Sequence, residues 1–169
     1  MPRLPDRFDL WIRKARKSAD QVRQVDWVLG ALVARDDLYF LNTGTKEQPQ
    51  IGGVHHSDVA DPADRFVVAF SDAQRLEEFA KERGVQGSAR FGNELPAIVS
   101  PMVAALDWCV ERKMGLVINP NVGETVMVPP PVLAEFVEEW KQRSGRQGAG
   151  FWIPNMTTEE EDFWQAYGL

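Results

Sequence analysis

The spacing of hydrophobic residues along this chain follows two different periods, which predicts a domain that mixes helices with a sheet. In residues 8–25, apolar side chains recur every three or four positions, as on one face of a helix, and the opposite face carries lysines and arginines. Residues 65–70 and 115–119 are instead short, almost continuous apolar runs that end at turn or helix-start signals, which is typical of buried strands.

Further strands are expected at residues 38–41 and 125–128, with short extended pieces around 51–55 and 88–91. Residues 42–64 are rich in Gly, Asp, Thr, Gln and Pro. A loop of this length is expected to be either mobile or functional.

The helix starts are predicted from capping residues and prolines. Asp26 is expected to cap a helix that continues to Val33, and Ser71 with Gln74 forms a capping box for the next helix, which ends at Gly84. The remaining helices are predicted from near Ser100 to Lys113 with Pro101 at the first position, from Pro129 to Ser144, and from Thr157 to Tyr167 with a capping box of Thr158 and Glu161.

These elements predict an α/β (α+β) fold with a mixed sheet of about four or five strands flanked by helices. We expect a single globular unit with an N-terminal helical extension at residues 1–36, an α/β domain at 37–144, and a linker with a docked aromatic tail at 145–169.

Composition narrows the functional classes. The chain is 44% hydrophobic and 26% charged, as in ordinary globular domains, and no apolar run approaches the roughly 20 residues that cross a bilayer. The N-terminus shows no export signal, and the single cysteine forms no internal disulfide, so we expect a cytoplasmic protein that does not associate with a membrane.

Charge is distributed unevenly. The net charge of −6 argues against nucleic acid as a partner. Residues 1–25 nevertheless carry seven basic and three acidic side chains, whereas residues 155–169 carry four acidic and no basic ones. These segments can attract each other, within one chain or between two, but two solvated faces are the favoured interpretation because exposed ion pairs contribute little.

The order of short motifs from Leu38 to Trp140 resembles the SseB-type family, named after the enhanced serine sensitivity protein of bacteria. The resemblance rests on the segments "VAFSD" within Phe66–Phe79, the proline-broken helix at Leu95–Val110, "GLVINP" at Gly115–Pro120, and the strand and helix at Thr125–Trp140. It implies a mixed sheet flanked by helices and brings no established chemistry. Similar domains also occur among proteins suspected of being immunity partners of bacterial toxins.

The candidate reactive residues favour structural roles. Cys109 shares a helical stripe with Leu106 and Val110, so it is expected in the core and not as a nucleophile. His55 and His56 are adjacent and would point to opposite sides of a strand, which argues against a shared metal ion, although aspartates lie nearby. We therefore predict no metal, no cofactor and no catalytic residues.

Two segments are candidate binding sites. Asn119 and Asn121 follow a buried strand, where α/β sheets often place ligand loops, although a turn that needs these residues for its geometry alone is favoured. The tail has a heavy aromatic load that either packs on its own domain or anchors another protein. Its aromatic residues are Phe151, Trp152, Phe163, Trp164 and Tyr167.

The sequence thus favours a non-enzymatic, SseB-like protein that binds a protein partner or a second copy of itself. A toxin-immunity role is an alternative within this class. The alternative from another class is a small-molecule sensor or enzyme that uses the turn at Asn119–Asn121 and the loop at 42–64.

Overall fold

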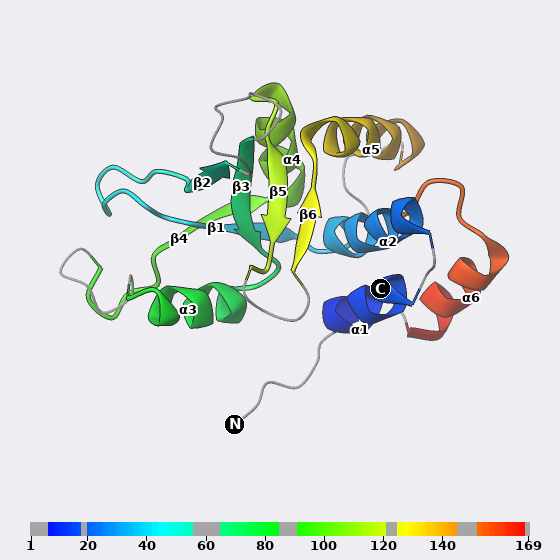
Figure 1. Cartoon of the computed structure of the whole chain (residues 1–169), viewed down its shortest axis with the longest axis horizontal. Helices are drawn as coiled ribbons and strands as arrows, with labels where there is room; N and C mark the ends of the chain where they lie inside the picture. Colours follow the sequence, from blue (N-terminus) through cyan, green and yellow to red (C-terminus); the bar gives the residue numbers. More distant parts are fainter. Residues whose placement is uncertain are drawn as a thin grey trace. The chain divides into compact units, whose positions relative to one another are not determined.

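The computed structural model describes residues 7–17, 20–55, 65–84, 91–120, 125–144 and 152–167. The chain divides into two compact units, one formed by Met1–Asp36 with Glu135–Leu169 and the other by Asp37–Ala134 (Figure 1). The second boundary falls inside a helix, α5, which spans Pro130–Ser144.

The sheet of the Asp37–Ala134 unit is mixed, which confirms the expected α/β fold. Five strands follow the order β4-β1-β3-β5-β6, and β2 also pairs with β3. Only the β3–β5 pair is parallel, and the other pairs are antiparallel. The strands are β1 at Asp37–Leu41, β2 at Gly53–His55, β3 at Arg65–Phe70, β4 at Ala97–Pro101, β5 at Gly115–Ile118 and β6 at Val126–Val128.

Two helices of this unit pack on opposite faces of the sheet. Leu76 and Ala80 of α3 (Ala73–Glu82) are buried in one cluster with Leu41, Val68 and Phe70. The neighbouring Phe40 contacts Trp108 of α4 (Met102–Glu111), with ring centroids 6.3 Å apart. Because successive side chains of a strand point to opposite faces, α3 and α4 lie on different sides of the sheet.

The strand β4 was not predicted. Its residues pair with β1 from Ala97↔Leu41 to Pro101↔Asp37, and the N–H of Asn42 donates to the carbonyl of Pro96 at 2.8 Å. The prediction that Pro101 is the first residue of the helix is wrong by one residue, since α4 begins at Met102 with Pro101 as its N-cap. Of the extended piece expected at 88–91, only Phe91 lies within the described residues, and it forms part of a turn.

The N-cap of α3 lies one residue later than expected. Asp72, not Ser71, is the N-cap, and its side chain accepts a hydrogen bond from the N–H of Arg75 at 3.0 Å. Gly84 has the left-handed backbone (φ +68°) expected after the helix.

The first part of the loop at 42–64 is an ordered hairpin (Figure 1). The side-chain Oδ1 of Asn42 accepts from the N–H groups of Gly44 and Gln50, at 2.9 and 3.0 Å, and its Nδ2 donates to the carbonyl of Thr45. Residues 56–64 lie outside the described residues.

The other unit is helical, and its first helices differ from the prediction. The expected helix at 8–25 is two helices, α1 at Arg7–Arg16 and α2 at Gln21–Val33. Asp20 is the N-cap of α2 because its backbone is extended and its side chain accepts from the N–H of Val22 at 2.9 Å. The predicted cap, Asp26, therefore lies inside a helix.

This unit also contains most of α5 and the C-terminal helix α6 (Thr158–Tyr167). Of the predicted apolar stripe, Phe8, Trp11, Ile12 and Ala15 are buried as expected, whereas Val22 is exposed and Ala19 lies outside the described residues. In the segment before α6, Ile153 is fully buried, so this tail is part of the folded unit.

Candidate functional site

A cleft of about 350 Å³ lies within the helical unit, lined by side chains of α1, α2 and the start of α6. Most of its lining is charged, with three cations and two carboxylates, and we refer to it as the charged cleft. The lining residues are Lys14, Lys17, Arg23, Trp27, Thr157, Glu159 and Glu160.

Arg23 connects α2 to the C-terminal tail. Its Nε donates to Oε1 of Glu160 at 3.0 Å, and its Nη2 donates to the carbonyl of Asn155 at 2.8 Å and also to Oε1 of Glu160. Its Nη1 donates to the carbonyl of Pro154 and, at 3.3 Å, to Oδ2 of Asp26. The guanidinium is thus engaged on all three nitrogens, which fixes the tail segment against α2.

Glu160 has two roles in this arrangement. It forms the capping box of α6 with Thr157, because Oε1 accepts from the N–H of Thr157 at 3.3 Å and the N–H of Glu160 donates to Oγ1 of Thr157 at 3.2 Å. The expected capping box of Thr158 and Glu161 is therefore wrong by one residue. Glu160 is also only 5% exposed, so its ion pair with the half-buried Arg23 is largely shielded from water.

The basic head and the acidic tail attract each other within the chain. Besides the pair of Arg23 and Glu160, Lys14 forms an ion pair with Glu159 at 3.0 Å, in which Glu159 is 80% exposed. The interpretation as two solvated faces is therefore wrong for the first of these pairs, since Glu160 is buried and the Arg23 side chain is only 20% exposed.

Burial raises the pKa of the Asp26 carboxyl to about 6 from 3.8. The Arg23 guanidinium beside it opposes this change, whereas the carboxylates of Glu139 and Glu160 add to it. Asp26 is thus a carboxyl group that changes charge close to neutral pH.

Two of the five aromatic residues predicted to bind a partner pack within the chain. The ring of Phe163 lies edge-on to Trp11 and Trp27, with centroid distances of 4.6 and 5.5 Å, and Trp152 lies 5.4 Å from Phe136 of α5. Both side chains are half-buried. The side chains of Trp164 and Tyr167, and all of Phe151, lie outside the described residues.

Asn119, the first of the two predicted ligand-binding residues, is a structural residue of the sheet. It is 1% exposed with a left-handed backbone (φ +50°), its Oδ1 accepts from the N–H of Ser71, and its Nδ2 donates to Oγ of Ser71, both at 3.0 Å. Its carbonyl accepts from the hydroxyl of Thr125 at 2.7 Å. Its side-chain amide is thus used inside the protein, and Asn121 lies outside the described residues.

Cys109 is fully buried, as expected, and this burial raises the pKa of its thiol to about 12 despite the nearby Arg112. A thiol with this pKa is not a nucleophile at neutral pH. The backbone of His55 lies in β2 opposite Arg65, whereas His56 and the neighbouring aspartates are outside the described part of the chain. Within the described part, no group of three or more His, Cys, Asp or Glu residues is placed to hold a metal ion.

The charged cleft was not identified from the sequence. The unequal charge of the two chain ends was the available signal, but it did not indicate which residues meet. Glu160 lies 137 positions from Arg23, and neither residue belongs to a recognisable motif.

Comparison with known proteins gives no relative. No protein-family model, curated protein or solved structure matches this chain. The resemblance to the SseB-type family therefore stays a prediction from the sequence. Within the described residues, no helix is long and apolar enough to span a membrane.

Proposed function

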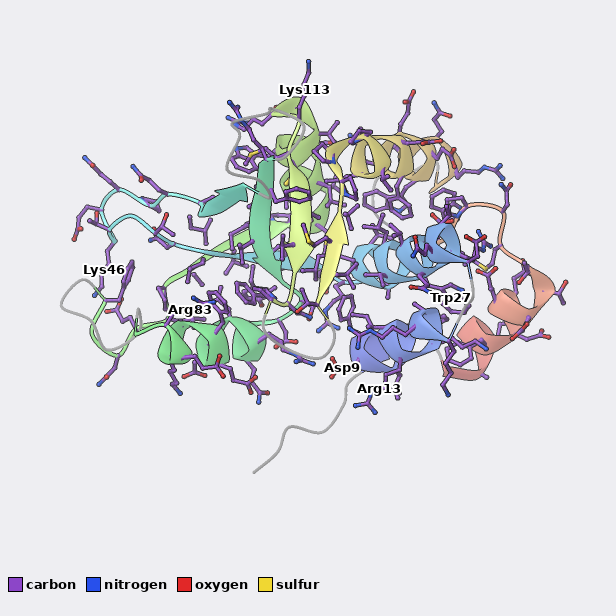
Figure 2. The ribbon with its side chains drawn as sticks, viewed as in Figure 1. Asp9, Arg13, Trp27, Lys46, Arg83 and Lys113 are labelled. Carbon is purple, nitrogen blue, oxygen red and sulfur yellow. The ribbon has the colours of Figure 1, made fainter. Side chains whose placement is uncertain are left out.

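We propose that this protein acts by binding a partner protein and not by catalysis, and that the outer face of α1 forms part of the contact. This face, which we call the basic face, consists of Leu10, Arg13, Arg16 and Lys17, all of them exposed. It lies opposite the buried stripe of the same helix, and Figure 2 shows Arg13 pointing away from the unit. An exposed leucine among cations is the observation that supports the proposal most directly, since Leu10 is 37% exposed.

The electrostatics favour an acidic partner. The basic face is a positive region on a chain whose net charge is −6. Such a local reversal of sign attracts an acidic surface and repels a basic one. Val22, at the start of α2, adds a second apolar side chain that is 71% exposed.

The alternatives within the same class differ in the partner. A second copy of this chain carries exposed acidic side chains on α6, among them Glu159 and Glu161, so self-association uses the same complementarity. A basic toxin would instead require an acidic surface on this protein, and the basic face gives the immunity alternative no support.

The test is capture of a companion from the native cell extract at moderate salt by the tagged full-length chain. The variant Arg13→Ala/Arg16→Ala is compared with Lys46→Ala/Lys113→Ala, which removes the same charge from the other unit (Figure 2). We expect a stoichiometric companion, identified by mass spectrometry, with wild type and control, and at least a several-fold loss with the α1 variant.

The outcomes separate the two parts of the proposal. Equal capture by all three proteins would support partner binding and exclude the basic face. Recovery of the chain without any stoichiometric companion, and as a monomer, would contradict partner binding itself.

A further inference from the structure

The helix α6 packs beside α1 and α2 through one of its faces, with two anchoring side chains one turn apart (Figure 1). The first is the carboxylate of Glu160, which is 5% exposed and accepts hydrogen bonds from Arg23. The second is the ring of Phe163, which lies edge-on to Trp11 and Trp27. Anchors at positions i and i+3 are the pattern by which an amphipathic helix docks in a groove of another protein.

The surface that receives α6, which we call the docking surface, consists of Trp11, Lys14, Arg23 and Trp27. Its two indoles pack on each other with centroids 4.6 Å apart, so α1 and α2 both contribute to its aromatic part. The ammonium of Lys14 lies 3.0 Å from the carboxylate of Glu159 and 5.3 Å from the centroid of the Phe163 ring. Since α6 has four acidic residues and no basic one, helix and docking surface are complementary in charge.

The contact between α6 and the docking surface is incompletely packed. The charged cleft of about 350 Å³ lies at this contact, because α1, α2 and the start of α6 all line it. Oε2 of Glu160 is buried without a hydrogen-bond partner among the described residues, which is costly and rare in folded proteins. The other described side chains of α6 are exposed or half-buried. A helix held in this way opens locally more easily than a core helix does.

We propose that the docking surface binds an acidic amphipathic helix of the partner protein, and that α6 is a resident helix which the partner's helix replaces. The partner's helix has a carboxylate for Arg23 and, three residues later, an aromatic ring for the two indoles. This inference rests on the proposed function, because it names the chemistry of the acidic partner that the basic face attracts.

The resident helix controls access to the docking surface. Trp11 and Trp27 are 1% and 3% exposed while α6 is docked, so another helix reaches them only after α6 has left. A helix tethered to its own binding site competes at an effective concentration on the order of millimolar. The apparent affinity for a second helix is reduced by the fraction of chains in which the surface is vacant. Weakening α6 is therefore expected to strengthen binding of a helix added from outside.

The probe for the test is a fluorescein-labelled peptide of residues 152–167, and its binding to the full-length chain is measured by fluorescence anisotropy at low salt. The full-length variant Phe163→Ala weakens the resident helix and leaves every residue of the docking surface in place. We expect the peptide to bind this variant at least tenfold more tightly than it binds wild type. Gln165→Ala, at an exposed position of α6, is the control and should bind the peptide as wild type does.

Two further substitutions test the assigned contacts in the Phe163→Ala chain. A peptide that itself carries Phe163→Ala should bind this chain at least tenfold more weakly than the unaltered peptide. Lys14→Glu, added to the chain, should also lower the affinity at least tenfold, because it places a negative charge opposite an acidic helix. Lys113→Glu makes the same change of charge in the other unit and should leave the affinity unchanged.

Circular dichroism and thermal unfolding show whether each variant is folded. Should Phe163→Ala not fold, Glu159→Lys weakens the resident helix instead, since it breaks the ion pair with Lys14 at a position that is 80% exposed. Three results would each overturn the proposal: equal affinity of wild type and the folded weakened variant, no binding to that variant, or equal affinity of the two peptides. Each of them leaves capture of a companion through Arg13 and Arg16 intact, so the two proposals fail separately.

Discussion

Asn119 shows how one side chain joins two strands at their ends. Its side-chain amide forms hydrogen bonds with both the backbone N–H and the hydroxyl of Ser71. Its backbone N–H donates to the carbonyl of Ala69 at 2.9 Å. A left-handed backbone is tolerated better by asparagine than by most residues, which explains why this residue type follows β5. Of the two roles that the sequence allows at this position, a turn that needs asparagine for its geometry or a ligand site, these contacts favour the first.

Substitutions at Asn119 separate the contribution of its side-chain hydrogen bonds from that of its left-handed backbone. Asn119→Ala loses the side-chain hydrogen bonds to Ser71 and also places alanine, which disfavours a left-handed backbone, at φ +50°. Asn119→Gly loses only the hydrogen bonds. We expect Ala to lower the free energy of unfolding by about 3 kcal/mol and Gly by about 1 kcal/mol less than Ala. Urea unfolding of both variants measures this, and equal losses would show that the backbone conformation is not strained.

Protonation of Asp26 makes the stability of the helical unit depend on pH. Its carboxyl titrates near 6 in the folded chain and near 3.8 when unfolded, so between these values the folded state binds more protons. The contribution of this group to stability is therefore present below pH 3.8 and is lost as the pH rises through 6. The groups that set this behaviour are Arg23, Glu139 and Glu160.

The variant Asp26→Asn removes this dependence. At pH 7.5 we expect its free energy of unfolding to exceed that of wild type by about 1–2 kcal/mol. The raised pKa alone would give a larger gain, but the substitution also weakens the hydrogen bond from Arg23 to this side chain. Near pH 4 the difference should disappear. Urea unfolding at both pH values provides the measurement, and a variant less stable than wild type at pH 7.5 would show that the bond to Arg23 dominates.

At the scale of elements, the local sequence patterns predicted the central residues of helices and strands better than the residues at their ends. The strand at Arg65–Phe70 was predicted with its bounds, because a continuous apolar run is a strong local signal. The strand β4 was missed because its prolines resemble a broken helix start and its pairing with β1 joins residues about 60 positions apart, such as Asp37 and Pro101. Two helix starts were predicted at the wrong residue because more than one possible capping side chain is present in each segment. The N-caps are Asp20 and Asp72, which have extended backbones, and not the predicted Asp26 and Ser71.

The fit of β5 between its neighbours depends on Gly115. A Cβ at this position would lie 2.4 Å from the carbonyl oxygen of Val128 in β6 and 2.8 Å from the ring of Phe66 in β3. The backbone oxygen cannot move without shifting its strand, so Gly115→Ala is expected to cost about 3 kcal/mol of unfolding free energy.

Gly84→Ala is the matched control for this prediction. Among the described residues, no atom lies within 4 Å of its added Cβ, so the left-handed backbone at φ +68° is what opposes the substitution. We expect a loss of about 1 kcal/mol in urea unfolding. A Gly115→Ala variant no less stable than Gly84→Ala would contradict the close packing of β5 against β6.

At the scale of the whole molecule, contacts between distant parts of the sequence build the helical unit. Phe163 contacts Trp11 and Trp27, and Lys14 lies over the same ring, 5.3 Å from its centroid. The charged cleft depends on the same meeting of α1, α2 and α6. Composition suggested that the two chain ends attract each other, but which side chains meet depends on tertiary packing, so the cleft could not be predicted from the sequence.

The variant Phe163→Ala tests this packing. It removes a half-buried ring from two tryptophans, so we expect the free energy of unfolding to fall by about 2 kcal/mol and the tryptophan emission to shift to longer wavelength as water reaches the indoles. Gln165→Ala, at an exposed position of the same helix, should change neither quantity. Unchanged emission and stability in Phe163→Ala would mean that α6 does not pack on α1 and α2 in solution.

The division of the helical unit into Met1–Asp36 and Glu135–Leu169 has a consequence for synthesis on the ribosome. Residues 37–134, which contain the whole sheet, emerge as an uninterrupted stretch and can fold as they appear. Trp11 and Trp27 are made early, yet the ring that covers them, Phe163, is made more than 130 residues later. During that interval Phe163 cannot cover the two indoles, so we expect α1 and α2 to be a binding site for chaperones until the C-terminal segment is made.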